Sequence, residues 1–356
     1  MLNAIIKGSG HYLPENIVKN SDFLSHEFYD EKGERILKSN EETIQKFKEI
    51  TEIEERRYAN PEMKNSEMAT IAGKRALEDA NLDPEQLDYI IVASNYGDIE
   101  KSCQTADFMP SMSTRVKHLL GIKNLKCRPY DMIFGCPGWI EAMIMATQFI
   151  QAGLAKNILV IGSDMVSRAI DPHDRTALIF SDGAGAVVLS AEESDEPKGV
   201  LGYGTYNYAQ DEISYLMSGP SLKASCKDYT KSVSMKGRKV YEFALRNVPQ
   251  AIKDVIDASG SDIGEIKKVL LHQANAKMDH AMVARLFKLY KAEAPEDVAP
   301  MTVQKFGNSS VATVPTMFDL IQKKELGTHE FKSNDKIIFA SVGAGMNINA
   351  IIYKVP

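Results

Sequence analysis

The sequence predicts an α/β fold in which one chain of 356 residues forms two similar halves. Short apolar segments alternate with amphipathic ones, this alternation occurs twice in the same order, and a charged loop over residues 191–198 separates the two series. Helices alternating with short, continuously apolar strands are typical of layered α/β proteins with mostly parallel, buried sheets. We therefore expect an N-terminal half, residues 1–190, and a C-terminal half, residues 191–356.

The N-terminal half begins with an apolar segment that we interpret as a first strand, because it is too short for a signal peptide and lacks a cleavage site. The later strands are short apolar runs, and the two helices keep their large apolar residues on one face. The expected elements, in chain order, are a strand over 1–7, a helix over 66–80, a strand over 87–93, a helix over 136–153, and strands over 158–162 and 186–189.

The C-terminal half repeats this order, and its first helix again keeps its apolar residues on one face. The expected elements are a helix over 239–259, a strand over 266–272, a helix over 276–291, a helix opened by residues 306–308, and a strand over 337–341. Two polar segments have no place in the repeat. Residues 24–45 are expected to form an insertion or cap and residues 209–234 an irregular excursion, and long loops of this kind often cover functional sites.

Composition excludes several functions. The net charge of −6 is not that of a general nucleic-acid binder, and no apolar run reaches the roughly 18 residues that span a bilayer. The four cysteines, Cys103, Cys127, Cys136 and Cys226, form no CxxC pair and show no regular spacing. We therefore expect no disulfide framework and no metal site, and a reducing cytoplasm as the location.

Cys136 is the candidate nucleophile. It lies in Phe134-Gly135-Cys136-Pro137-Gly138, where Pro137 suits the first position of a helix. The partial positive charge of a helix N-terminus is expected to lower the pKa of the thiol, and the flanking glycines allow a substrate to approach. A buried structural cysteine is the plainer interpretation, and we keep it for the other three cysteines.

His272 and Asn308 are the candidate partners of this thiol. His272 ends the strand over 266–272, where α/β sheets place functional groups, and Phe306-Gly307-Asn308 is a near-copy of the residues around the cysteine. An ordinary core histidine and a helix N-cap are the plainer interpretations. Together the imidazole and the amide can donate two hydrogen bonds to one carbonyl oxygen, as an oxyanion hole for an enolate does. A second oxyanion hole is expected from the Cys136 N–H and the turn Gly343-Ala344-Gly345.

These residues, with their neighbours, resemble the β-ketoacyl-ACP synthase III family of thiolase-fold condensing enzymes. The matching segments cover most of the chain and read TEIEERR from 51, GCPG from 135, IGSD from 161, FSDGAGA from 180, MKGR from 235, HQAN from 272 and FGNSS from 306. The resemblance implies a five-layer αβαβα core, a homodimer, and an acyltransferase whose substrates are an acyl-CoA and malonyl-ACP. It also implies substrate or ACP binding by Arg56, Met235, Gly237 and Asn275, with CoA and phosphopantetheine thioesters as substrates and no bound cofactor.

The chemistry implied is a ping-pong condensation. Cys136 would take the acyl group, and His272 and Asn308 would hold the malonyl thioester while it loses CO₂. The chain departs from the family in Cys136-Pro137-Gly138, where Cys-Ala-Gly is usual, in Thr51-Glu52-Ile53 for Thr-Gly-Ile, and in having Trp139 as its one tryptophan. The acyl donor is therefore open between an ordinary acyl-CoA, an unusual one and an acyl-ACP.

Three other functions remain open from the residues. A related synthase of secondary metabolism, making resorcinols, quinolones or polyketides, would keep the same three residues. A cysteine hydrolase can also present Cys, His and Asn in this order. A non-catalytic partner subunit of a synthase typically loses one of them, and here all three are present.

The helix expected over 276–291 is a candidate docking surface for an acidic carrier protein. Lys277, Arg285 and Lys288 fall close to one face of it, directly after the HQAN segment. Because the chain as a whole is negative, docking would need such a local basic patch. A merely solvated amphipathic face is the plainer interpretation.

Overall fold

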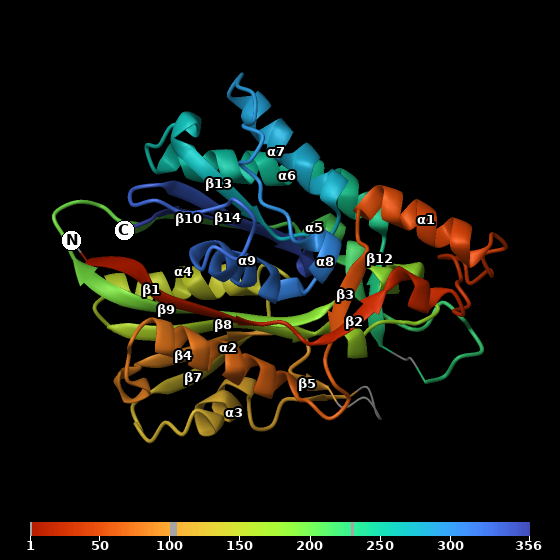
Figure 1. Cartoon of the computed structure of the whole chain (residues 1–356), viewed down its shortest axis with the longest axis horizontal. Coiled ribbons are helices and arrows are strands. Elements are labelled where there is room, and N and C mark those ends of the chain that lie inside the picture. Colours follow the sequence, from red (N-terminus) through yellow and green to blue (C-terminus); the bar gives the residue numbers. More distant parts are fainter. Residues whose placement is uncertain (1, 100–104, 229–230) are drawn as a thin grey trace.

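The computed structural model describes residues 2–99, 105–228 and 231–356. They form five layers, in which two sheets alternate with three layers of helices (Figure 1). In Figure 1, α6 and α7 cover one sheet, α4 and α9 lie between the sheets, and α2 and α3 cover the other sheet. This is the αβαβα arrangement that the family resemblance implies.

The N-terminal sheet has five strands in the order β1-β9-β8-β4-β7. The pairs β1–β9 and β9–β8 are antiparallel, whereas β8–β4 and β4–β7 are parallel. The strand bounds are Leu2–Tyr12 for β1, Asp182–Glu193 for β9, Asn157–Met165 for β8, Tyr89–Ala93 for β4 and Arg128–Met132 for β7.

The C-terminal sheet has four strands in the order β10-β15-β14-β13. The pairs β10–β15 and β15–β14 are antiparallel and β14–β13 is parallel. The first four strands of the N-terminal sheet therefore recur in the same order and directions, as a duplicated fold requires. The strand bounds are Gly199–Asn207 for β10, Asn347–Lys354 for β15, Lys336–Gly343 for β14 and Ile266–Leu271 for β13.

The expectation of mostly parallel sheets is wrong, because both sheets of the described structure are mixed. The reason is clearest in the C-terminal half, where the turn Ala344–Met346 joins β14 directly to β15. A connection this short can join only antiparallel strands, since parallel neighbours need a long crossover. The predicted division at residues 190 and 191 falls inside β9.

The central helices α4, Gly138–Gln151, and α9, Thr313–Gln322, are buried on nearly every side. One apolar cluster joins them to the inner faces of both sheets, which is why these two sequences are apolar almost all round. Trp139 is 1% exposed and packs edge to face on Phe339 of β14, with ring centroids 5.7 Å apart. The tryptophan therefore belongs to the core.

The outer helices are amphipathic and bury one face each. α2 (Asn65–Asp79) and α3 (Met112–Leu119) pack on the N-terminal sheet, and α6 (Gly237–Ala258) and α7 (Ala276–Leu289) pack on the C-terminal sheet. The starts and ends of α2, α6 and α7 agree with the sequence-based ranges to within about two residues, whereas α3 was not predicted. None of the described helices is long and apolar enough to cross a membrane.

The two segments outside the repeat contain short elements. Residues 24–39 are largely irregular, and α1 begins at Asn40, inside the predicted insertion. The Tyr29 backbone N–H donates to the His173 carbonyl (2.8 Å), which ties this segment to the loop between β8 and β9. The remaining short elements are α1 Asn40–Thr51, α5 Ala209–Glu212, α8 Val303–Phe306, β2 Asn16–Lys19, β3 Glu55–Tyr58, β5 Asp98–Ile99, β6 Ala106–Asp107, β11 Leu216–Gly219 and β12 Ser232–Met235.

Candidate active site

Cys136 lies at the N-terminal end of α4, on a tight turn. Gly135 has a φ of +73°, and its carbonyl accepts the Gly138 N–H at 2.9 Å. The sequence predicted Pro137 in the first helical position. In the structure α4 begins at Gly138 and Pro137 is the cap residue, one position earlier. The turn places Cys136 two residues before the first residue of α4, at the end of the helix where a helix leaves its first backbone N–H groups without partners inside the helix.

The turn between β14 and β15 packs directly on this nucleophile loop. A Cβ added to Gly343 would lie 2.6 Å from the Cys136 nitrogen, and one added to Gly135 would lie 2.8 Å from the Ala344 nitrogen. The Asn347 amide donates to the Ala344 carbonyl at 3.0 Å and thereby holds the turn. Only glycines permit so close an approach. The turn places Ala344 and Gly345 beside Cys136, where their role in an oxyanion hole stays a prediction.

The Cys136 thiol is not the acidic thiol that its place at a helix end suggested. Burial raises its pKa to about 11, and the Asp164 carboxylate adds to the rise. A hydrogen bond from Ser310 acts in the opposite direction. The residue as a whole is partly exposed, but its surroundings favour the neutral thiol in the free protein. The expectation of a lowered pKa is therefore wrong, because desolvation outweighs the helix end.

His272 immediately follows β13, and its backbone N–H donates to the Ala340 carbonyl at 2.8 Å. The side chain is buried, and burial lowers the pKa of the imidazole to about 4. The ring is therefore neutral at pH 7 and can carry one N–H donor and one acceptor. Its Nδ1 makes no hydrogen bond of good geometry. The nearby Ser310 backbone raises the pKa of the imidazole, but this effect is smaller than the lowering by burial.

Asn308 lies between α8 and a 3₁₀ turn, Ser310–Ala312, and is buried. Its backbone pairs with the segment before β9: its N–H donates to the Ile179 carbonyl and its carbonyl accepts the Ser181 N–H, both at 2.9 Å. The predicted helix does not begin here, because α9 starts five residues later at Thr313. The Asn308 Oδ1 accepts the Ser310 N–H at 2.8 Å, so the amide N–H₂ is left to donate elsewhere.

Ser310 connects the three predicted residues and was missed by the sequence-based reasoning. Its hydroxyl lies 3.5 Å from the Cys136 sulfur, its N–H orients Asn308, and its backbone lies beside His272. The thiol, the imidazole and the amide therefore lie around one serine. The signal was present in Phe306-Gly307-Asn308-Ser309-Ser310, but a serine hydroxyl two residues from a candidate amide has no distinctive spacing.

The buried Arg56 corrects one predicted substrate contact. Its side chain is 0% exposed, and its guanidinium donates to the Val18 and Leu178 carbonyls and to the Asn20 side chain. The charge also lies over the Phe23 ring. Burial lowers the pKa of this guanidinium to about 10. Arg56 therefore holds the strands β2 and β3 to the core and is not available to a substrate in this structure.

The other predicted binding residues lie on β12, α6 and α7 of the C-terminal half. Asn275 caps α7, since its side chain accepts the Met278 N–H at 3.1 Å. Met235 ends β12 and packs in an apolar cluster with Tyr96 and Ile99, and Gly237 begins α6. The side chains of Lys277, Arg285 and Lys288 are exposed on α7, as predicted. Their contact with a substrate or carrier stays a prediction.

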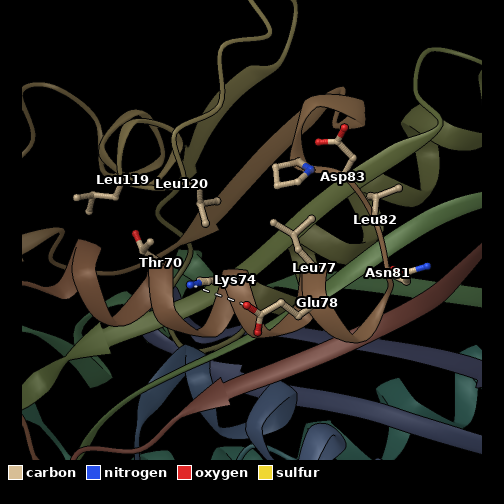
Figure 2. Close-up of a pocket in the computed structure, with 10 residues that line it drawn as sticks. Thr70, Lys74, Leu77, Glu78, Asn81, Leu82, Asp83, Leu119 and Leu120 are labelled. Atoms are coloured by element: carbon tan, nitrogen blue, oxygen red, sulfur yellow. Dashed lines mark ion pairs between the residues drawn. The ribbon is translucent and has the colours of Figure 1, made fainter.

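A hollow of about 740 Å³ lies on the outer face of the molecule between α2 and α3. Figure 2 shows Lys74 and Glu78 of α2 paired within it, with Leu119 and Leu120 across from them. No predicted site residue lines this hollow. Within the described ranges, no group of three or more His, Cys, Asp and Glu side chains could hold a metal ion, and Cys103 falls outside those ranges.

The raised pKa predicts how the free protein reacts with alkylating reagents. Because the thiolate is the reactive form, alkylation of Cys136 by iodoacetamide should be slow at pH 7 and rise about tenfold per pH unit up to at least pH 9.5. Peptide mapping by mass spectrometry at several pH values measures this rate. A rate that levels off near pH 7 would show instead that the helix end controls the thiol.

The two halves of the chain match one family of sequences. The sequence model for 3-oxoacyl-acyl-carrier-protein synthase III matches residues 130–208, and the model for the C-terminal part of the same enzymes matches residues 256–355. The first match contains Cys136, and the second contains His272 and Asn308.

Individual relatives are similar to this chain over almost their full length. The chain is 32% identical over 354 residues to β-ketoacyl-acyl-carrier-protein synthase III of Staphylococcus haemolyticus, covering 99% of each chain. It is 34% identical over 355 residues to the protein of that name from Caldanaerobacter subterraneus, covering 98% of this chain and 97% of the other. The crystal structure of 3-oxoacyl-acyl-carrier-protein synthase III from Aquifex aeolicus superposes with a TM-score of 0.78 at 30% identity, covering 99% and 100% of the two chains. The chain therefore belongs to the β-ketoacyl-ACP synthase III family of thiolase-fold condensing enzymes.

Proposed function

We propose that this chain is an acyltransferase that condenses an acyl group held on Cys136 with malonyl-ACP to give β-ketoacyl-ACP. Family membership over the full length supports the reaction class. The residues are assigned from the arrangement around Ser310. The Cys136 thiol, the His272 imidazole and the Asn308 amide all lie next to this serine.

In the first half-reaction, the Cys136 thiol loses its proton and the sulfur attacks the carbonyl carbon of the acyl-CoA thioester. The N–H groups of Cys136 and of the turn at Ala344 and Gly345 stabilise the oxyanion that forms. The bond from that carbon to the CoA sulfur then breaks, and CoA leaves as the thiol with a proton. A base is needed, since burial holds the thiol neutral in the free protein. The neutral His272 ring can accept that proton.

In the second half-reaction, the malonyl C–CO₂ bond breaks and its electron pair forms the enolate of the ACP thioester. The His272 N–H and the Asn308 amide donate to the enolate oxygen. The enolate carbon attacks the acyl carbon, the bond to the Cys136 sulfur breaks, and the sulfur recovers a proton from solvent water. A ring with a pKa of about 4 donates a hydrogen bond at pH 7 without carrying a charge.

CoA and the phosphopantetheine arm of ACP enter this scheme as substrates, so the reaction needs no resident cofactor. The donor is found most directly by incubating the protein with a panel of acyl-CoAs and acyl-ACPs and measuring its intact mass. We propose a cytoplasmic location, which suits the free thiols of Cys127, Cys136 and Cys226. The proposed division into halves at residues 190 and 191 separates Cys136 from His272 and Asn308.

A groove on α7 supports a docking site for the carrier protein. It has a volume of about 640 Å³ and lies between α6 and α7. Apolar side chains form its floor, and Arg285 and Lys288 line it with their exposed charges. Acyl carrier proteins are acidic, so the basic residues attract the carrier and the apolar floor gives it a surface to bury. The helix follows His272–Asn275 directly in the chain, so the groove and the histidine are connected by one short segment.

Charge reversal on this groove should affect only the ACP half-reaction. We expect Arg285→Glu with Lys288→Glu to raise the KM for malonyl-ACP at least about tenfold and to weaken its salt dependence. Acylation by acyl-CoA should hardly change. Initial rates at several ionic strengths measure both effects.

A matched variant controls for the change in net charge. Lys324→Glu with Lys332→Glu makes the same change at two exposed lysines outside the groove and should leave the KM for malonyl-ACP unchanged. If both half-reactions suffer equally in the α7 variant, the groove has a CoA-binding or structural role and the docking proposal fails.

We propose that a second copy of this chain covers β7. This strand is at the edge of the N-terminal sheet and pairs only with β4 among the described strands. Tyr130 is 43% exposed and Ile133, which follows the strand, is 62% exposed. An open edge with exposed apolar side chains is a liability unless another chain covers it. Ultracentrifugation should give a dimer for the native protein and a monomer for Tyr130→Lys with Ile133→Lys, whereas a monomeric native protein would contradict the proposal.

The alternative functions are less well supported. The full-length relatives carry the name β-ketoacyl-ACP synthase III, which does not favour a synthase of secondary metabolism. Membership in a condensing-enzyme family argues against a cysteine hydrolase. A non-catalytic subunit is not favoured either, because the chain keeps Cys136, His272 and Asn308 around one point.

A further inference from the structure

Ser310 has an unusual backbone for a buried serine beside a nucleophile. Its φ is +55°, in the left-handed region that non-glycine residues rarely adopt, and the residue is 4% exposed. Strained conformations of this kind persist where the surrounding structure holds them, and they cluster at functional sites. Here the strained residue directs its hydroxyl to the Cys136 sulfur, 3.5 Å away.

Asn95 fixes the direction of that hydroxyl. The Asn95 amide nitrogen lies 3.0 Å from the Ser310 oxygen and 2.8 Å from an oxygen of Asp164, so its two hydrogens serve these two acceptors. With one lone pair of the Ser310 oxygen occupied by the amide, the hydroxyl hydrogen is directed away from Asn95. The Cys136 sulfur is an acceptor within its reach.

Asp164 anchors the amide and is itself fully buried. Its carboxylate accepts from the Ser94 hydroxyl at 3.0 Å, the Asn95 N–H at 2.8 Å and the Asn95 amide. It also lies close enough to Ser310 to compete for the hydroxyl hydrogen. A carboxylate acting alone would oppose a thiolate, because two negative charges repel. The intervening amide and hydroxyl instead present a donor to the sulfur.

We infer that Ser310 is a positioning residue for the nucleophile, whose hydroxyl donates a hydrogen bond to the Cys136 thiolate and is held in place by Asn95 and Asp164. This inference rests on the proposed role of Cys136 as acyl carrier. It adds one contribution to the proposed scheme. His272 and Asn308 act on the malonyl enolate, His272 also accepts the proton of the thiol, and Ser310 stabilises the thiolate that forms. The hydrogen bond lowers the pKa of the thiol against the effect of burial.

The rate of alkylation of Cys136 by iodoacetamide tests the inference without any enzyme substrate. A hydrogen bond to a charged group contributes enough to make Ser310→Ala alkylate about 10- to 100-fold more slowly than the native protein at pH 8. Glycine adopts the left-handed backbone without strain, so Ser310→Gly removes the hydroxyl alone. Its alkylation rate should fall to the same degree as that of Ser310→Ala. Ser309→Ala is the matched control, because the Ser309 hydroxyl contacts Thr313.

Two further arms separate positioning from damage to the whole site. Asn95→Ala keeps the hydroxyl but frees it, and should slow alkylation by a smaller factor than Ser310→Ala. Decarboxylation of malonyl-ACP, which uses His272 and Asn308, should stay within about threefold of native in Ser310→Ala, because the Ser310 N–H to Asn308 remains.

Three outcomes overturn the inference. They are native alkylation rates in both Ser310 variants, a slowed rate in Ser310→Ala that Ser310→Gly does not share, and an equal loss of alkylation and decarboxylation. The proposed function fails separately, if native protein is acylated by no acyl-CoA or acyl-ACP even though iodoacetamide modifies Cys136.

Discussion

Replacing Cys136 by alanine should abolish covalent acyl transfer. The thiol is the nucleophile in the proposed scheme, and loss of a nucleophile in a comparable site costs a factor on the order of 10⁶ in turnover. The intact mass of Cys136→Ala should not change after incubation with any acyl-CoA that adds mass to the native protein. No β-ketoacyl-ACP should form with malonyl-ACP.

Two other cysteines provide matched controls. Cys127 is buried at the end of the connection before β7, and Cys226 lies in the segment between β11 and β12. Neither contacts the residues around Ser310, so Cys127→Ala and Cys226→Ala should still gain the acyl mass. Normal acylation of Cys136→Ala, at any other residue, would exclude Cys136 as the acyl carrier.

Replacing His272 or Asn308 by alanine should separate the two half-reactions. Removal of one donor from an oxyanion hole lowers the rate by a factor on the order of 10²–10³, and that loss should appear in malonyl-ACP decarboxylation. Acylation should remain measurable in both variants, because the sulfur and its Ser310 partner remain. Release of CO₂ from labelled malonyl-ACP and the intact mass of the acyl-enzyme measure the two steps.

His280→Ala and Asn16→Ala are suitable controls, since both side chains are exposed and outside the site. They should decarboxylate malonyl-ACP at the native rate. If His272→Ala and Asn308→Ala also decarboxylate at the native rate, the enolate role is wrong. If His272→Ala loses acylation completely, the imidazole is the required base for the thiol and no other group replaces it.

The parts of the fold that local patterns determine could be predicted from the sequence. The outer helices α2, α6 and α7 bury one apolar stripe each, and β4, β13 and β14 are short apolar runs, so their positions follow from periodicity. Strand directions could not be predicted in the same way. They depend on which strands become neighbours, and this is a property of the whole sheet.

In the candidate site, too, local features could be predicted and features that depend on distant contacts could not. Cys136, His272 and Asn308 could be singled out because each ends or precedes a regular element. The pKa of the thiol could not, because it depends on how deeply the folded chain buries the sulfur and on the distant Asp164.

Two other site features depend on contacts across the sequence. Ser310 acquires its role through Asn95, which is 215 residues away, and Arg56 loses its expected role by burial against Leu178. Only the folded structure shows such contacts, because the residues next to Ser310 and Arg56 in the sequence do not indicate them.

The most direct test of the condensing function follows the acyl group from the protein to the carrier. Native protein is first acylated with the best donor of the panel, separated from free donor, and mixed with malonyl-ACP, and the masses of both proteins are then measured. We expect the acyl mass to leave Cys136, CO₂ to be released, and the ACP to carry the acyl group extended by the two-carbon unit of the malonyl group. Release of the acyl group as a free acid, with malonyl-ACP unchanged, would show a hydrolase and contradict the proposed function.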